Sequence, residues 1–320
     1  MKLTGTIVDV KGIKVGQVQN EQALTGCTVL MMEEGAVCGV DVRGSAPGTR
    51  ETDLLHPCNL VDRVHAILLT GGSAFGLDAA SGVMKYLEEH GYGLDTGFAK
   101  VPIVPAAALF DLPLGDAKVR PDQAMGYQAA SVASTEQVAQ GNKGAGCGAS
   151  VGKACGFDKA MKGGLGSFAR VYPNGLVIGA IVAVNAVGEV RDMYSGEVLA
   201  GARDEHNKIQ NILTGMMGTG FAPIPGGTNT TIGVVASNAK LTKTQANKVA
   251  QLSHNGLART IYPVHTMFDG DTIFAVATGE VEASVDLVGT LSADVLAEAV
   301  MLAIKHAESA GGLPAYRDLK

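Results

Sequence analysis

The segment whose residues are best placed to carry out a reaction runs from Pro223 to Asn238 and reads PIPGGTNTTIGVVASN. Its Pro- and Gly-rich half delivers Asn229 and Thr230 to the head of an apolar strand. If the Thr230 hydroxyl attacks the Asn229 carbonyl, an N-to-O acyl shift gives an ester that water can open. Thr230 then becomes a new N-terminal residue, and its α-amine, with a reference pKa of about 7.7 to 8.0, can serve as the general base. A threonine that opens a strand without any function is the alternative.

A pair of carboxylates lies downstream, in HTMFDGDTIFAVAT over residues 265–278. Asp269 and Asp271 are separated by one glycine, just before another apolar strand. Residues two apart in an extended segment face the same side, so both carboxylates can point at one place. One would hold the Thr230 ammonium or hydroxyl while the other orients it, in the manner of a catalytic triad. An ordinary Asp-Gly-Asp turn is the alternative.

Other kinds of site lack their sequence patterns. The chain has no G-x-x-x-x-G-K-[ST] loop, and GAGCGASVG at 144–152 has the wrong glycine spacing for a dinucleotide fingerprint. Its five cysteines form no C-x-x-C pair and its seven histidines no H-E-x-x-H pair, so we expect no cofactor and no metal. The segment GGSAFG lacks the second glycine of a nucleophile elbow.

The overall composition narrows the choice of partners. The net charge is -6, with only 7 tyrosines and 8 phenylalanines and no basic cluster, so we expect no nucleic acid partner. No apolar run reaches the roughly 18 residues of a membrane span, and the polar start MKLTGTIVDVKG lacks the features of a secretory signal. We therefore expect a soluble, cytoplasmic protein without a membrane partner.

The elements that must position these groups are short strands with a few helices between them. Apolar, β-branched segments predict strands near 5–16, 27–32, 36–41, 64–70, 176–185, 231–237 and 272–278. Three helices are predicted from capping residues and helical spacing: Ser73 to Gly91, Thr242 (with Gln245 completing a capping box) to Gly256, and Ser292 to the residues before Gly311. Clustered strands with few helices indicate layered sheets faced by helices, in one domain.

Four segments together resemble the self-processing DmpA-like aminopeptidases, a family that includes D-aminopeptidases, β-peptidyl aminopeptidases and the nylon-oligomer hydrolase NylC. They are DVRGSAPGTRETD at 41–53, TGGSAFGLDAASGVM at 70–84, VPIVPAAALFDL at 101–112 and NTTIGVVASNA at 229–239. The resemblance implies an α/β (α+β) fold, an αββα sandwich similar to N-terminal-nucleophile hydrolases with DmpA/ornithine acetyltransferase-like topology. It also implies one hydrolase domain, 1–320, cleaved into an α fragment (1–229) and a β fragment (230–320), and a homo-oligomer, often a tetramer.

The same resemblance assigns roles to individual residues. It makes Thr230 the nucleophile and Asn229 the last residue of the α fragment. Aminopeptidase members usually carry a serine nucleophile and a Ser/Glu pair, so the set Thr230, Asp269 and Asp271 is closest to the nylon-oligomer hydrolase branch.

Three further positions follow from the resemblance, each beside a plainer alternative. Lys153, in SVGKACG, is similar in place to a site lysine that stabilises negative charge or lowers the pKa of the α-amine; a solvated loop lysine is the alternative. Asn185, after GLVIGAIVAV, matches the neighbourhood of an oxyanion-stabilising asparagine. Phe110, in LFDL, is expected to line the substrate pocket or to pack in the core.

The sequence thus predicts an N-terminal threonine hydrolase that cleaves amide bonds of small peptides or amino-acid oligomers through an acyl-enzyme on Thr230. An acyl transferase similar to ornithine acetyltransferases is the first alternative, and an inactive binding protein with the same fold is the second. The preference among α-, β-, D- and ω-amino acid substrates, and the choice between terminal and internal attack, stay open.

Overall fold

Residues 5–219 and 229–319 are described by this computed structural model, and their longer strands form one nine-stranded mixed sheet. The strands are β1 (Lys14–Asn20), β2 (Thr25–Val42), β3 (Gly48–Arg50), β4 (Arg63–Thr70), β7 (Ala106–Ala108), β10 (Gly164–Val171), β11 (Val177–Asn185), β14 (Thr230–Ala239) and β16 (Thr272–Val281). Their order is β10-β11-β14-β16-β2-β4-β7-β3, and β1 also pairs with β2.

The remaining strands form small peripheral sheets. They are β5 (Leu94–Asp95) with β6 (Lys100–Val101), β8 (Ser150–Val151) with β9 (Met161–Lys162), and β12 (Glu189–Arg191) with β13 (Val198–Ala200) and β15 (Ile261–Tyr262). The helices are α1 (Ala79–Glu89), α2 (Gln123–Ser131), α3 (Ile212–Thr219), α4 (Lys243–Thr260) and α5 (Val285–Lys305).

The long strand β2 divides the sheet into two layers. Its first part pairs with β1 and β4, whereas its last part pairs with β16, and the register with β4 shifts between Met31 and Ala36. Ile67 of β4 and Ile232 and Val234 of β14 belong to one buried cluster, which is the core between the layers. Alternate residues of β14 face the other way, because side chains along a strand point to opposite faces.

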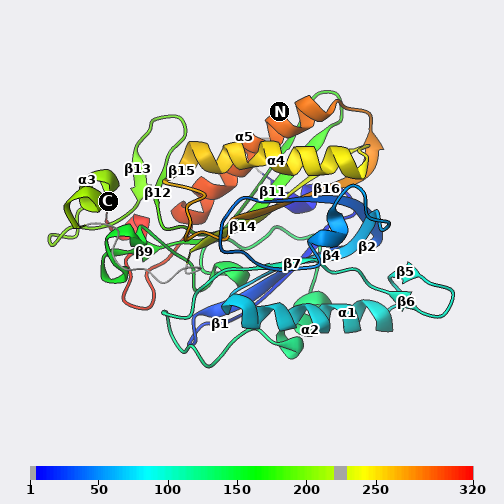
Figure 1. Cartoon of the computed structure of the whole chain (residues 1–320), viewed down its shortest axis with the longest axis horizontal. Coiled ribbons are helices and arrows are strands. Elements are labelled where there is room, and N and C mark those ends of the chain that lie inside the picture. The colour runs from blue at the N-terminus through cyan, green and yellow to red at the C-terminus, as the bar shows by residue number, and fades with distance from the viewer. Residues whose placement is uncertain (1–4, 220–228, 320) are drawn as a thin grey trace.

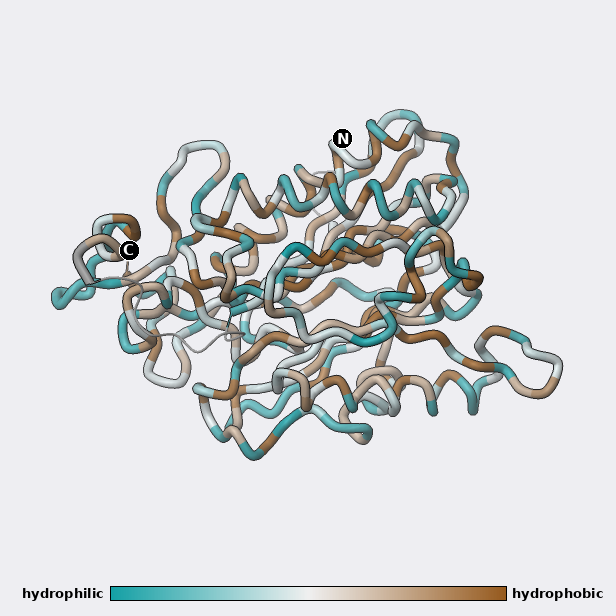
Figure 2. Tube along the Cα trace, viewed as in Figure 1, coloured by the Kyte–Doolittle hydropathy of each residue, from teal (hydrophilic) through white to brown (hydrophobic). Residues whose placement is uncertain are grey.

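Helices cover the outer face of each layer (Figure 1). Helices α4 and α5 pack on β10, β11, β16 and the last part of β2, and α1 and α2 pack on β1, β4 and the first part of β2. Figure 2 shows the apolar segments concentrated between these helix pairs. The fold is therefore the αββα arrangement that the sequence predicted.

Helix α5 is long and apolar enough to cross a membrane by composition alone, with a mean hydropathy of 1.8 over its most apolar window. In the fold, however, 67% of that window is buried, and the helix packs on α4 and β10. Its apolar surface belongs to the core of the sandwich, as expected for a helix that is hydrophobic on most sides.

The strand predictions are confirmed with three corrections. The two strands predicted at 27–32 and 36–41 are one continuous strand, β2. The predicted strand at 5–16 is wrong before Lys14, where β1 begins, and Ile7–Asp9 form a 3-10 turn instead. Strand β10 was missed, because its sequence GLGSFARV carries two glycines that lower strand propensity.

All three predicted helices exist, but several of their predicted first and last residues are wrong. The capping box of Thr242 and Gln245 is confirmed, but α4 continues past Gly256, which is a glycine because a Cβ there would lie 2.3 Å from the Ala293 carbonyl oxygen of α5. Ser73 caps no α-helix; it has a φ of 55° and opens a 3-10 segment before α1. Ser292 is buried inside α5, whose actual N-cap is Ser284.

Candidate active site

The peptide bond between Asn229 and Thr230 is buried at the head of β14, where Thr230 is only 2% exposed. The Thr230 hydroxyl donates a hydrogen bond to the carbonyl oxygen of Asn229. The backbone N–H of Gly270 donates to the same oxygen at 2.9 Å. The carbonyl that would be cleaved thus has a hydroxyl beside it and an amide donor placed where negative charge would develop on its oxygen.

The turn that supplies the Gly270 amide requires a glycine. A Cβ at residue 270 would lie 2.9 Å from the Thr230 hydroxyl oxygen and 2.7 Å from the Ala46 carbonyl oxygen. The segment after β2 supports this turn, because the amides of Arg43 and Ala46 donate to the carbonyls of Asp271 and Asp269 at 3.0 and 2.9 Å. The segment at residues 43–46 therefore holds the carboxylate turn against Thr230.

Asp269 and Asp271 lie close together and are each 1% exposed, but they bind different partners. Oδ2 of Asp269 accepts hydrogen bonds from the amide and the hydroxyl of Thr266, at 2.8 and 2.5 Å. Oδ1 of Asp271 accepts from the Thr231 amide at 2.7 Å. In the uncleaved chain the Thr230 hydroxyl binds its own upstream carbonyl, and Asp271 holds the backbone of the residue that follows. Burial, together with the neighbouring Asp271, raises the pKa of Asp269.

Asn185 and Lys153 approach the same place from β11 and from the segment after β8. Asn185 is paired with Thr230 across the antiparallel β11–β14 ladder. Its Oδ1 accepts from Nζ of Lys153 at 2.8 Å and from the Ser150 amide at 3.0 Å, and Lys153 also donates to the Asn185 backbone carbonyl at 3.0 Å. These contacts fix the Asn185 side chain, because each oxygen lone pair has a donor.

Lys153 is buried, whereas the alternative drawn from the sequence was a lysine in a solvated loop. It is 4% exposed, and burial lowers its pKa to about 7, while the charge of Asp269 acts in the opposite direction. A lysine in this state exists partly as the free amine at neutral pH, which suits a proton acceptor. The solvated loop lysine is thereby excluded.

Phe110 reaches the site through its backbone. Nδ2 of Asn185 donates to the Phe110 carbonyl at 3.0 Å, and this uses one of its two hydrogens. Phe110 follows β7, in the other layer, and its side chain is partly exposed. The predicted role of its ring in lining a substrate pocket stays a prediction.

Sequence reasoning missed two contributors to this region. His265 binds Asp271, and its neighbour Thr266 binds Asp269. Lys162 is fully buried, donates to the carbonyls of Cys147 and Ala149 at 3.0 and 2.6 Å, and has a pKa lowered to about 8 by burial. The position of His265 six residues before Asp271 was the available signal for the first; no spacing signalled the second.

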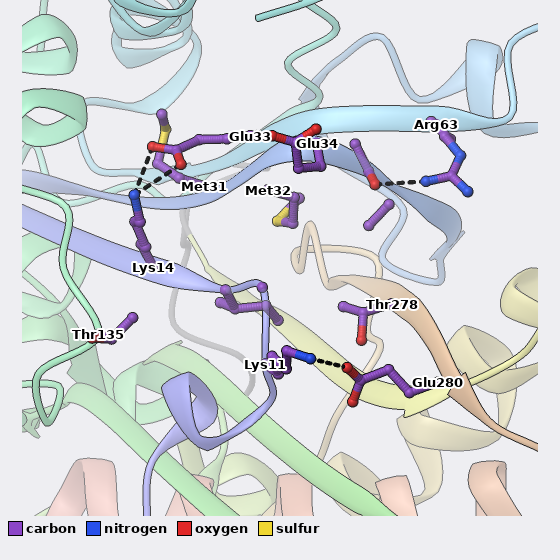
Figure 3. A pocket seen from close by; sticks show the side chains of 14 residues that line it. Lys11, Lys14, Met31, Met32, Glu33, Glu34, Arg63, Thr135, Thr278 and Glu280 are labelled. Atoms are coloured by element: carbon purple, nitrogen blue, oxygen red, sulfur yellow. Dashed lines mark hydrogen bonds and ion pairs between the residues drawn. The ribbon is translucent and has the colours of Figure 1, made fainter.

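A cavity of about 400 Å³ opens elsewhere, at the opposite end of β16 from Asp271 (Figure 3). Met31 and Met32 lie in it, and the ion pairs Lys14–Glu33 and Lys11–Glu280, each 2.8 Å, lie at its edge. None of its lining residues belongs to the group around Thr230. The residues around Thr230 are therefore separate from this cavity.

Two solved structures of aminopeptidases have the same fold as this chain. An L-aminopeptidase D-Ala-esterase/amidase from Ochrobactrum anthropi, described as a variant of the Ntn hydrolase fold, matches with a TM-score of 0.73 and 21% identity over 98% of this chain and 90% of that one. A Burkholderia sp. beta-aminopeptidase matches with a TM-score of 0.71 and 20% identity, over 100% of this chain and 94% of that one. At this identity the likeness establishes the fold, that of the N-terminal-nucleophile hydrolases.

The sequence comparison establishes the family. Residues 5–316 match Peptidase family S58, and the chain belongs to that family. An uncharacterized aminopeptidase of Mycobacterium tuberculosis is 41% identical over 98% of this chain and 97% of its own length. A 6-aminohexanoate-oligomer endohydrolase of Kocuria sp. is 33% identical over 86% of this chain and 75% of its own. The protein is a hydrolase that acts on peptide or other amide bonds.

Proposed function

We propose that the chain cleaves itself between Asn229 and Thr230 and that the released Thr230 is the nucleophile of an amide hydrolase. The observation that carries this proposal is the pair of donors on one carbonyl oxygen. The Thr230 hydroxyl and the Gly270 amide both bind the Asn229 oxygen, so the attacking group and an oxyanion donor are already in place.

Self-cleavage then proceeds in two steps, an acyl transfer and the hydrolysis of an ester. In the first, Oγ1 of Thr230 loses its proton to the free amine of Lys153 and attacks the Asn229 carbonyl carbon, with the oxyanion held by the Gly270 amide. The carbon–nitrogen bond breaks and the nitrogen of Thr230 takes a proton, which gives an ester and a free α-amine. In the second, water opens the ester, leaving a carboxylate on Asn229 and the hydroxyl on Thr230.

Substrate hydrolysis uses the same groups in a new arrangement. The α-amine of Thr230 accepts the hydroxyl proton while Oγ1 attacks the substrate carbonyl, and it passes this proton to the amine that leaves as the carbon–nitrogen bond breaks. Water then opens the ester on Oγ1, which releases the acid and restores the hydroxyl. The second hydrogen of Asn185 Nδ2 is available to the oxyanion, while Asp269 and Asp271 keep the strand head and its ammonium in place. Because Thr230 is buried before cleavage, the new end at Asn229 has to leave the site before a substrate can enter.

The substrate class we propose is a small peptide or an oligomer of amino acids joined by amide bonds. Support comes from two directions: the family is one of peptidases, and a 33% identical relative is named for hydrolysis of 6-aminohexanoate oligomers. We further propose a homo-oligomer, a tetramer of cleaved units, as the family resemblance of the sequence implies. The cytoplasmic location expected from the composition is also a proposal.

Intact-mass measurement and denaturing electrophoresis test the proposal. The expected result is conversion into fragments of 229 and 91 residues, the second being 320 minus 229. Thr230→Ala should stay uncut and inactive, whereas Thr230→Ser should still be processed. Full-length protein that hydrolyses amides with the junction intact would overturn the mechanism.

A substrate panel follows from the alternatives that remain. The processed enzyme is assayed with p-nitroanilides of L-, D- and β-amino acids and with a 6-aminohexanoate oligomer. Incubation with N-acetylornithine and glutamate is the comparison for acyl transfer, and formation of acetylglutamate without amide hydrolysis would favour a transferase.

A further inference from the structure

His265 is a partly buried residue that no step above uses, and it contacts one of the two carboxylates twice. Its side-chain Nδ1 lies 2.8 Å from Oδ2 of Asp271, and its backbone N–H donates to the same oxygen at 3.1 Å. Since a carboxylate oxygen only accepts, Nδ1 carries the hydrogen. Asp271 therefore has three N–H donors, two of them from His265 and one from Thr231.

The backbone of His265 is held in an uncommon conformation by these contacts. Its φ is +57°, in the left-handed region that non-glycine residues rarely occupy and in which Asn, Asp and His are the most frequent of them. Such a conformation persists where surrounding interactions determine it. Here the two contacts with Asp271 hold His265 in this conformation, and they hold the Asp271 carboxylate in turn.

The imidazole ring is also fixed from its other side. The ring of His254, on α4, packs edge-on against it with centroids 4.8 Å apart, and His254 is itself completely buried. His254 is anchored by a 3.0 Å contact from Nε2 to the Asp41 backbone carbonyl. Burial lowers the pKa of His254, so it forms a neutral wall that leaves His265 little freedom to rotate.

We propose that His265 is a positioning residue for Thr230 and that it acts through Asp271. By holding Oδ2, it keeps Oδ1 on the Thr231 amide, and that amide belongs to the peptide unit that joins Thr231 to the nucleophile. Without the Nδ1 donor, Oδ2 of Asp271 keeps only the backbone N–H of His265, and the carboxylate holds the Thr231 amide less firmly in place. This role rests on the proposed function of Thr230.

The neighbouring residue makes the same kind of contact with the other carboxylate. Thr266 donates its amide and its hydroxyl to Oδ2 of Asp269, as His265 donates its amide and its ring nitrogen to Asp271. Two consecutive residues thus hold the two carboxylates of the turn separately. Each carboxylate therefore has its own side-chain donor, which is more than folding of the turn alone would require.

Three variants separate the donor from the backbone conformation. His265→Asn keeps a side-chain N–H at the position of Nδ1 and tolerates a positive φ, so it should retain most of the self-cleavage rate. His265→Gly accepts the conformation but removes the donor, and the rate should fall about 10²-fold, as expected for a displacement of about 1 Å in a reacting group. His206→Asn, an exposed histidine, is the matched control and should cleave like the unaltered chain.

Cleavage is followed by intact mass, and the melting temperature of each variant is recorded so that unfolded protein is recognised. Equal rates for His265→Gly and the unaltered chain would overturn the proposal. So would an equal loss in His265→Gly and His265→Asn at unchanged melting temperature, because the donor would then be irrelevant.

A second measurement does not depend on cleavage. In chains that also carry Thr230→Ala, hydrogen exchange of the Thr231 amide should be faster with His265→Gly than with His265→Asn, since the first variant loosens its acceptor. Equal exchange would refute the positioning role even if the protein never cleaves itself. Absence of cleavage in the unaltered chain would refute the proposed function alone.

Discussion

The state of Lys153 makes the pH dependence of self-cleavage a direct test of the mechanism. Its pKa is lowered to about 7 because the ammonium would be buried away from water. The free amine therefore makes up about 1% of the molecules at pH 5, about half at pH 7 and about 90% at pH 8. If the amine accepts the Thr230 proton, the cleavage rate rises about tenfold per unit up to pH 6, then flattens above pH 7, about 90-fold in all from pH 5 to pH 8.

The sign of this dependence separates two roles for Lys153. A proton acceptor is active in its neutral form, so the rate rises with pH through 7. A positive charge that stabilises the oxyanion is active in its protonated form, so the rate would fall above pH 7. The Gly270 amide already supplies a donor to the Asn229 oxygen, and for this reason we expect the first behaviour.

The assay is a time course of intact mass at pH 5 to 9 on freshly purified uncleaved chain. Lys153→Met removes the amine but keeps the length of the side chain, and it should stop cleavage over the whole range. Lys243→Met is the matched control, because Lys243 is likewise a buried lysine that binds two carbonyls, those of Asn59 and Val61, and it is not among the groups that shift the pKa of Lys153. It should lower the melting temperature and leave the pH midpoint unchanged. A flat profile, or an unchanged rate in Lys153→Met, would refute the reasoning.

Three further changes have expected outcomes. Asp271→Asn turns an amide NH₂ toward at least one of three N–H donors, so it should cost about 1–3 kcal/mol in unfolding free energy and slow cleavage; denaturant titration and intact mass measure both. Gly270→Ala places a Cβ 2.9 Å from the Thr230 hydroxyl oxygen and should prevent cleavage, whereas Gly48→Ala, with its nearest contact at 3.7 Å, should cleave normally. The two fragments should co-elute in native chromatography and separate only in denaturant, because β14 lies between β11 and β16 within one sheet.

Local features of the fold were predictable because they depend on neighbours in the sequence. The alternation of apolar residues in β14 and the capping box at Thr242 are readable within ten residues. The same locality explains the errors. Ser292 opens the most apolar part of α5, but the helix begins a full two turns earlier, at Val285, where the sequence VDLVGTL is more polar and includes a glycine.

At the candidate site, the sequence by itself determined which groups are available: Asn229 and Thr230 ahead of a strand, and two carboxylates separated by one glycine ahead of another. Only the tertiary structure decided how they meet. The parallel pairing of β14 and β16 puts the Gly270 amide on the Asn229 carbonyl.

For Lys153 and Asn185, too, the sequence supplied the residue types and the tertiary structure decided their environment. Pairing of β11 with β14 sets Asn185 opposite Thr230, and burial beneath that pair lowers the pKa of Lys153. Both effects join residues 32 to 45 positions apart, and no local periodicity encodes which strands become neighbours or how much water surrounds an amine. The residue types came from the sequence, whereas strand order and desolvation gave them a geometry in which they can react.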